Sequence, residues 1–130
     1  MKKPFIHGIS TGALAAIAAI IYNNAYTNAL VVDFSKIINL GGLIGSSLFG
    51  GIIASLGYFA FQKWIKNYTD VIFNIIFVIL TFASLIGSFA TNLPTDIEAP
   101  ELFIGLSVPM HFFPIIFWLA TKPLFYKNNN

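Results

Sequence analysis

The sequence predicts an all-α fold, a bundle of four transmembrane helices. Two observations support this prediction: 57% of the 130 residues are hydrophobic, and only 9% are charged. Soluble domains carry about 25% charged residues, and a domain of this size leaves much of its surface exposed. The apolar surface must therefore face lipid, and we expect residues 1–130 to form a single integral membrane domain.

Four apolar segments each have about the length of one helical span, roughly 20 residues. Only helices and closed barrels satisfy the backbone within lipid, and a barrel strand would alternate polar and apolar residues over roughly ten positions. The runs here are continuous and contain no Asp, Glu, Lys or Arg. We therefore expect helices over residues 5–26, 40–61, 71–89 and 102–120.

The lysines predict how the four spans are oriented, because cytoplasmic loops carry an excess of Lys and Arg. Six of the seven cationic residues fall on one side of a four-span topology: Lys2, Lys3, Lys63, Lys66, Lys122 and Lys127. Only Lys36 falls on the other side. We therefore expect the N- and C-termini to be cytoplasmic.

The first span has a second interpretation. Met1-Lys2-Lys3 before an apolar run is also the outline of a signal peptide, and Thr27 and Ala29 provide small residues for a cleavage site. Cleavage there would leave three spans and an outer N-terminus, and the lysine count would still fit. Four spans are favoured because the apolar run exceeds the about 7–15 residues of a signal peptide.

The second span carries small residues at a spacing of four. The stripe that we expect to pack against other helices consists of Gly42, Ser46, Gly50 and Ala54. The adjoining face repeats the spacing with Ser47, Gly51 and Ser55. The first span offers a matching stripe of Gly8, Gly12 and Ala16. Small residues let helices approach closely in lipid, so we expect packing within the bundle, with a homodimer interface as the alternative.

The third and fourth spans carry polar residues. One face of the third, which we expect to point inward, holds Asn74, Thr81, Ser84 and Ser88. In the fourth span, His111 lies between Pro109 and Pro114, which each remove a helical amide and free a carbonyl, those of Gly105 and Met110. An ionisable residue within a membrane is a candidate for a functional site. The alternatives are a neutral His111 that shapes a kinked helix, or a helix that begins only near Val108.

Eight polar residues fall at a similar depth toward the outer side of the four-span topology: His111, Ser107, Asn23, Asn24, Ser46, Ser47, Ser84 and Ser88. Their shared depth predicts a polar pocket that opens outward, with His111 at its floor. We expect His7, in contrast, to be a surface residue at the start of the first span.

Composition excludes several classes of function. The chain has no cysteine, which excludes thiolate metal sites, thiol nucleophiles and redox pairs. A net charge of +2 is too small to indicate a nucleic-acid partner. The usual hydrolase, metalloprotease and nucleotide-binding motifs are missing, and one intramembrane histidine without an acidic partner is poor acid–base machinery. We do not expect an enzyme, and we assign no metal and no cofactor.

The chain resembles uncharacterised bacterial four-helix inner-membrane proteins, a domain of unknown function. The resemblance lies in residues 87–100, GSFATNLPTDIEAP, and 101–125, ELFIGLSVPMHFFPIIFWLATKPLF, with the glycine-rich second span before them. Its most specific part is 109–114. It implies an inner-membrane protein and carries over no catalytic residue. The membrane-embedded Glu of small multidrug transporters and the first-helix Arg usual in dual-topology fluoride channels have no counterpart here.

We expect a small multi-pass protein of a bacterial inner membrane with a structural or accessory role. Its partners would be the lipid bilayer and either a second copy, forming a homo-oligomer, or another membrane protein. The alternative is a small-molecule or lipid binder, or a transporter, that uses the polar pocket around His111.

Overall fold

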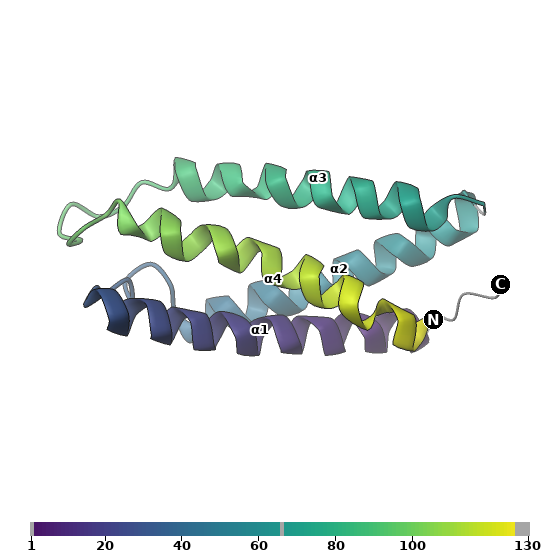
Figure 1. Cartoon of the computed structure of the whole chain (residues 1–130), viewed down its shortest axis with the longest axis horizontal. Helices are drawn as coiled ribbons and strands as arrows, with labels where there is room; N and C mark the ends of the chain where they lie inside the picture. Colours follow the sequence, from purple (N-terminus) through teal and green to yellow (C-terminus); the bar gives the residue numbers. More distant parts are fainter. Residues whose placement is uncertain (1, 66, 127–130) are drawn as a thin grey trace.

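The computed structural model describes residues 2–65 and 67–126, and these residues form four helices (Figure 1). They are α1 (Lys2–Leu30), α2 (Leu40–Trp64), α3 (Thr69–Ala90) and α4 (Leu102–Phe125). No strand occurs within these ranges, so the predicted all-α fold is confirmed. All four helices are long and apolar enough to cross a membrane. Lys66 and Lys127, two of the lysines used to predict orientation, lie outside the described residues.

Each helix contains its predicted span, and all four are longer than predicted. Hydropathy marks the part of a helix that lipid covers, whereas the helix itself continues until a cap or a turn ends it. Asn39 caps α2, and its side-chain oxygen accepts a hydrogen bond from the Gly42 amide at 2.7 Å. The alternative in which the fourth helix begins near Val108 is wrong, because α4 is helical from Leu102.

The four helices do not pack evenly. Figure 1 shows α1 and α3 on opposite sides, with α2 and α4 crossing between them. Among the described residues α1 and α3 do not touch, and α3 rests on α4 and α2 alone. We call the end that holds segments 31–39 and 91–101 the loop end, and the end that holds Lys2 and Phe125 the terminal end.

The contact between α1 and α2, which we call the glycine seam, is made by backbone. A Cβ atom on Gly8 would lie 2.7 Å from the Cα of Ile52, and one on Gly12 would lie 2.6 Å from the Cα of Leu48. A Cβ atom on Gly51 would overlap the carbonyl oxygen of Gly8. Glycine is therefore required at all three positions, and the first two spans pack within the bundle.

The two small-residue stripes of α2 face different helices. Gly51 belongs to the adjoining stripe with Ser47 and Ser55, whereas a Cβ atom on Gly50 would face Pro114 of α4 at 3.7 Å. Both stripes have the same spacing and similar residue sizes, so spacing alone could not show which of them faces α1.

Candidate functional site

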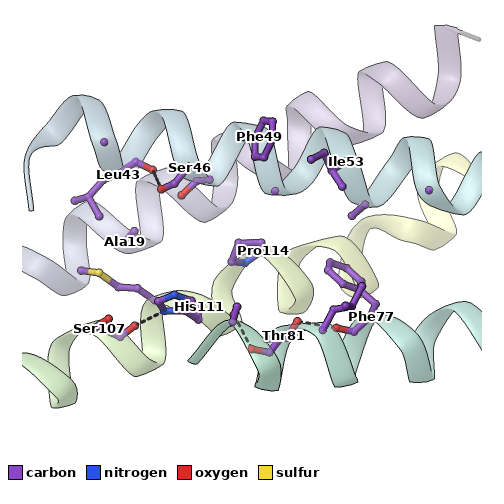
Figure 2. A pocket seen from close by; sticks show the side chains of 18 of the residues that line it. Ala19, Leu43, Ser46, Phe49, Ile53, Phe77, Thr81, Ser107, His111 and Pro114 are labelled. Atoms are coloured by element: carbon purple, nitrogen blue, oxygen red, sulfur yellow. Dashed lines mark hydrogen bonds between the residues drawn. The ribbon is translucent and has the colours of Figure 1, made fainter. Parts of the chain in front are cut away.

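A cavity of about 630 Å³ lies between α2, α3 and α4 (Figure 2). This volume is typical of sites for small molecules. Its wall runs along α2 from the cap residue Asn39 to Phe61, which at 1.5 Å per residue spans about 33 Å along the helix axis. The cavity is therefore long and narrow, and close in length to the hydrocarbon thickness of a bilayer, about 30 Å.

Polar residues line the cavity at one end only. Toward the loop end and the middle, the wall contains Asn39, Ser46, Ser47, Thr81, Ser84, Ser107 and His111, together with apolar side chains such as those of Leu43, Phe103 and Met110. Toward the terminal end, the wall is apolar and consists of Ile53, Ala54, Gly57, Phe61, Phe73, Ile76 and Phe77. No Lys, Arg, Asp or Glu is among the described residues that line it. The site thus has the polarity of a molecule with one polar head and one apolar tail.

The cavity opens sideways, between α2 and α3. Three apolar residues of its wall, Phe49, Ile53 and Leu80, are each more than half exposed. Figure 2 shows Phe49 and Ile53 on α2, across the space from Phe77 and Thr81 of α3. In a bilayer this opening would face lipid tails. His111 lies in the wall of the cavity. The predicted opening toward the outer side stays a prediction.

His111 is held in place by its own helix and by α3. Its Nδ1 lies 2.8 Å from the carbonyl oxygen of Ser107 and 3.4 Å from the hydroxyl of Ser88. The hydroxyls of Ser88 and Ser107 lie 2.6 Å apart. Because a carbonyl only accepts, Nδ1 carries the hydrogen, and in the neutral ring Nε2 is left as an acceptor. Nε2 has no hydrogen bond to any described residue.

The structure brings together most of the residues predicted for the pocket. Ser46, Ser47, Ser84, Ser107 and His111 line the cavity, and Ser88 lies behind it against Ser107. Asn23 and Asn24 do not line it, and Asn24 is exposed. Both belong to α1, of which only Ala19 reaches the cavity.

Tyr22 binds one of the two carbonyls that the prolines of α4 were predicted to free, that of Gly105. Pro109 cannot donate to the carbonyl of Gly105, and the Tyr22 hydroxyl donates to that carbonyl at 2.9 Å. The neighbouring Tyr26 hydroxyl donates to the carbonyl of Leu102 at 2.8 Å. The loop end of α4 is therefore tied to α1 by two hydroxyl groups.

The polar face of α3 is buried in part. Thr81 and Ser88 are buried, and Ser84 is exposed at the cavity. The side-chain oxygen of Asn74 is buried without a hydrogen-bond partner among the described residues.

His7 was missed by the sequence analysis, which predicts it at the surface. The structure buries it completely, so that prediction is wrong. Its Nε2 lies 3.0 Å from the hydroxyl of Thr121, and its Nδ1 lies 3.3 Å from the hydroxyl of Ser55. The Trp118 indole also donates to Ser55, at 2.9 Å. The partners lie 48 and 114 residues away in sequence, and the one local signal was Thr11, four positions after His7 on the same face.

The two histidines differ in how far their nitrogens are satisfied. Thr121 donates its proton to the carbonyl of Phe117 at 2.7 Å, so it accepts from His7 Nε2, and His7 Nδ1 accepts from Ser55. Both nitrogens of His7 are thus used within the bundle. Only His111 has a nitrogen left for a ligand.

A charged cluster joins α3 to the bundle at the terminal end. The Lys122 ammonium lies 2.9 Å from the Asp70 carboxylate, and the Tyr58 hydroxyl donates to the same carboxylate. Lys122 also lies 4.6 Å from the centre of the Tyr58 ring. This cluster connects α2, α3 and α4 outside the cavity.

Comparison with protein families, with curated proteins and with solved structures finds no match to this chain. The resemblance to a bacterial inner-membrane family therefore stays a prediction. Within residues 2–65 and 67–126, no three His, Asp or Glu side chains are grouped so that they could hold a metal ion.

Proposed function

We propose that this protein binds an amphipathic lipid within the membrane, in the cavity between α2, α3 and α4. The observation that carries the proposal is the polarity of the cavity, with hydroxyls and His111 toward one end and only apolar side chains toward the other. The lateral opening beside Phe49 and Leu80 gives a molecule from the lipid phase a way in. A compact polar solute would leave the apolar half of the cavity unmatched.

We further propose a bacterial inner membrane, with both termini in the cytoplasm. Among the described lysines, Lys2, Lys3, Lys63 and Lys122 belong to the terminal end, and Lys36 alone belongs to the loop end. This asymmetry supports a cytoplasmic terminal end. The polar half of the cavity would then accept a head group on the outer side.

Blocking the cavity tests the proposal. Ser46 is exposed at the cavity wall, so Ser46→Trp would fill the space beside His111. Leu56 is exposed on the same helix and does not line the cavity, so Leu56→Trp is the matched control. Native mass spectrometry of protein extracted in mild detergent should show a bound lipid in the wild type and in L56W, and none in S46W. Equal lipid occupancy in S46W would contradict the proposal.

A structural role through self-association is the second candidate. Gly41, Gly45 and Ser46 at the loop end of α2 are exposed, and a Cβ atom on Gly45 would meet no atom within 4 Å. Exposed small residues of this kind favour the approach of another helix. Crosslinking in native membranes should then give a stoichiometric dimer band that Gly45→Leu removes. A monomeric protein would exclude this candidate.

A further inference from the structure

Three hydroxyl groups in the cavity wall donate their protons to carbonyl oxygens of their own helices. Ser84 donates to the carbonyl of Thr81 at 2.6 Å, and the Thr81 hydroxyl donates to the carbonyl of Phe77 at 2.8 Å. Ser46 donates to the carbonyl of Leu43 at 3.3 Å (Figure 2). Carbonyl oxygens only accept, so each hydroxyl keeps lone pairs alone for a ligand.

His111 follows the same rule. Its Nδ1 hydrogen points to the Ser107 carbonyl, so in the neutral ring the lone pair of Nε2 is the polar function left for the cavity. Ring nitrogen and hydroxyl oxygens come from three different helices, α2, α3 and α4, and all of them present acceptors.

Other wall residues are not committed in this way. The hydroxyls of Ser107 and Ser88 lie 2.6 Å apart, and either can be the donor. Ser47 has no hydrogen bond to a described residue through its hydroxyl, and it is nearly buried, with its backbone against Gly12 of α1. Asn39 accepts from the Gly42 amide and keeps its own amide hydrogens, at the start of α2. The hydroxyls of Thr81 and Ser84, which lie on α3 across from His111, therefore offer acceptors.

Charge limits the ligand further. No described cationic side chain lines the cavity to balance a phosphate or a carboxylate, and no acidic one lines it to balance an ammonium group. An unpaired charge in an apolar environment costs several kcal/mol or more. A charged head group is therefore excluded from the position beside His111.

We infer that the ligand is an uncharged lipid whose head group donates hydrogen bonds, such as a long-chain alcohol or another hydroxyl-bearing neutral lipid. Its hydroxyl hydrogen bonds to Nε2 of His111, and its chain lies along the apolar half of the cavity toward Phe61 and Phe73. This inference rests on the proposed function and specifies the chemical class that the same cavity takes.

Three probes of equal chain length test the inference: hexadecanol, its methyl ether and hexadecanoate. The ether keeps the oxygen and the chain and lacks the donor. Titration of the purified protein, followed by native mass spectrometry, should show about ten-fold weaker binding of the ether, which corresponds to about 1.4 kcal/mol. Hexadecanoate should bind no better than the ether.

Variants at His111 assign the preference to its ring. In His111→Phe the alcohol and the ether should bind equally, whereas His111→Gln, which keeps a side-chain acceptor, should retain a preference for the alcohol. If H111F does not fold, the ratio of alcohol affinity to ether affinity in the wild type still tests whether the ligand must donate a hydrogen bond.

The possible failures are distinguishable. Equal binding of alcohol and ether by the wild type, or tighter binding of hexadecanoate, would overturn the donor inference and leave lipid binding intact. If the wild type binds the three probes no better than S46W does, the proposed function itself fails.

Discussion

The two small-residue faces of α2 have opposite roles. On the glycine seam, Gly51 lies so close to Gly8 and Gly12 of α1 that no side-chain atom fits between the helices. On the other face, Ser46 and Gly50 line an open cavity. The residues are similar in size, and the difference comes from the facing helix.

Small residues permit close approach without enforcing it. Facing the seam, α1 is also small and flat, so the two backbones meet. On the other face, the neighbour of Gly50 is the Pro114 ring of α4, which would lie 3.7 Å from a Cβ atom on Gly50. The same type of stripe therefore gives tight packing where both helices are small, and space where only one is.

Alanine substitutions at the adjacent glycines Gly51 and Gly50 should show the largest difference in stability between the two faces of α2. Gly51→Ala places a methyl group on the Gly8 carbonyl, and overpacking of this kind typically costs about 1–3 kcal/mol. We expect a loss near the upper end of that range in the free energy of unfolding, measured by SDS titration in mixed micelles.

Gly50→Ala is the matched control, because its methyl group would meet Pro114 at an ordinary 3.7 Å. Alanine is favoured over glycine within helices by up to about 1 kcal/mol, so G50A should be neutral or stabilising. Similar losses in both variants would contradict the distinction between the two faces.

Removing a hydroxyl from the seam should have the next largest effect. Ser55→Ala leaves the buried Trp118 indole and His7 Nδ1 without their shared partner. An unsatisfied buried polar group costs about 1–3 kcal/mol, and we expect about 1–2 kcal/mol here. Ser46→Ala should change stability by less than about 0.5 kcal/mol, since its exposed hydroxyl bonds only within its own helix.

A substitution in the charged cluster tests how α3, which contacts only α2 and α4 among the described helices, is held to the bundle. Asp70→Asn removes the partner of Lys122, whose side chain is only 12% exposed. Asp70 itself is 45% exposed, and solvent weakens such pairs, so we expect a loss of about 1 kcal/mol. Amide hydrogen exchange should accelerate in α3 and stay unchanged in α1. Glu98→Gln, the same change on an exposed loop residue, should leave both helices unaffected.

The smallest effect should come from the ion pair that joins the two segments of the loop end. The hydrogen bond from Lys36 lowers the pKa of Asp96 below its ordinary value of 3.8. The pair therefore contributes stability at pH values above 3.8, and that contribution is lost as the pH falls through the lowered pKa.

Lys36→Met should return the Asp96 pKa toward 3.8, as measured by NMR titration of its carboxyl carbon. Because both side chains are well exposed, high salt should reproduce part of this return in the wild type. An unchanged Asp96 pKa in K36M would show that the pair does not form in solution.

The sequence predicts the position of a residue along its helix better than the rotation of that helix about its axis. Hydropathy located all four helices, and shared depth grouped Ser46, Ser84 and His111, which the structure brings to one cavity. Asn23 and Asn24 have a similar depth but the wrong rotation. Rotation depends on contacts far apart in sequence, such as the one between His7 and Thr121, and no local pattern encodes those.

The buried network around His7 has a consequence for the order of assembly. Chains are synthesised from the N-terminus, so α1 and α2 enter the membrane before α4. Until then His7 and Thr11 have no Thr121 to bond with, although His7 can already pair with Ser55 of α2. A chain stopped before α4 would leave His7 Nε2 and the Thr11 hydroxyl without their Thr121 partner. The buried polar groups of α1 therefore gain their last hydrogen-bond partner only when α4 packs against it.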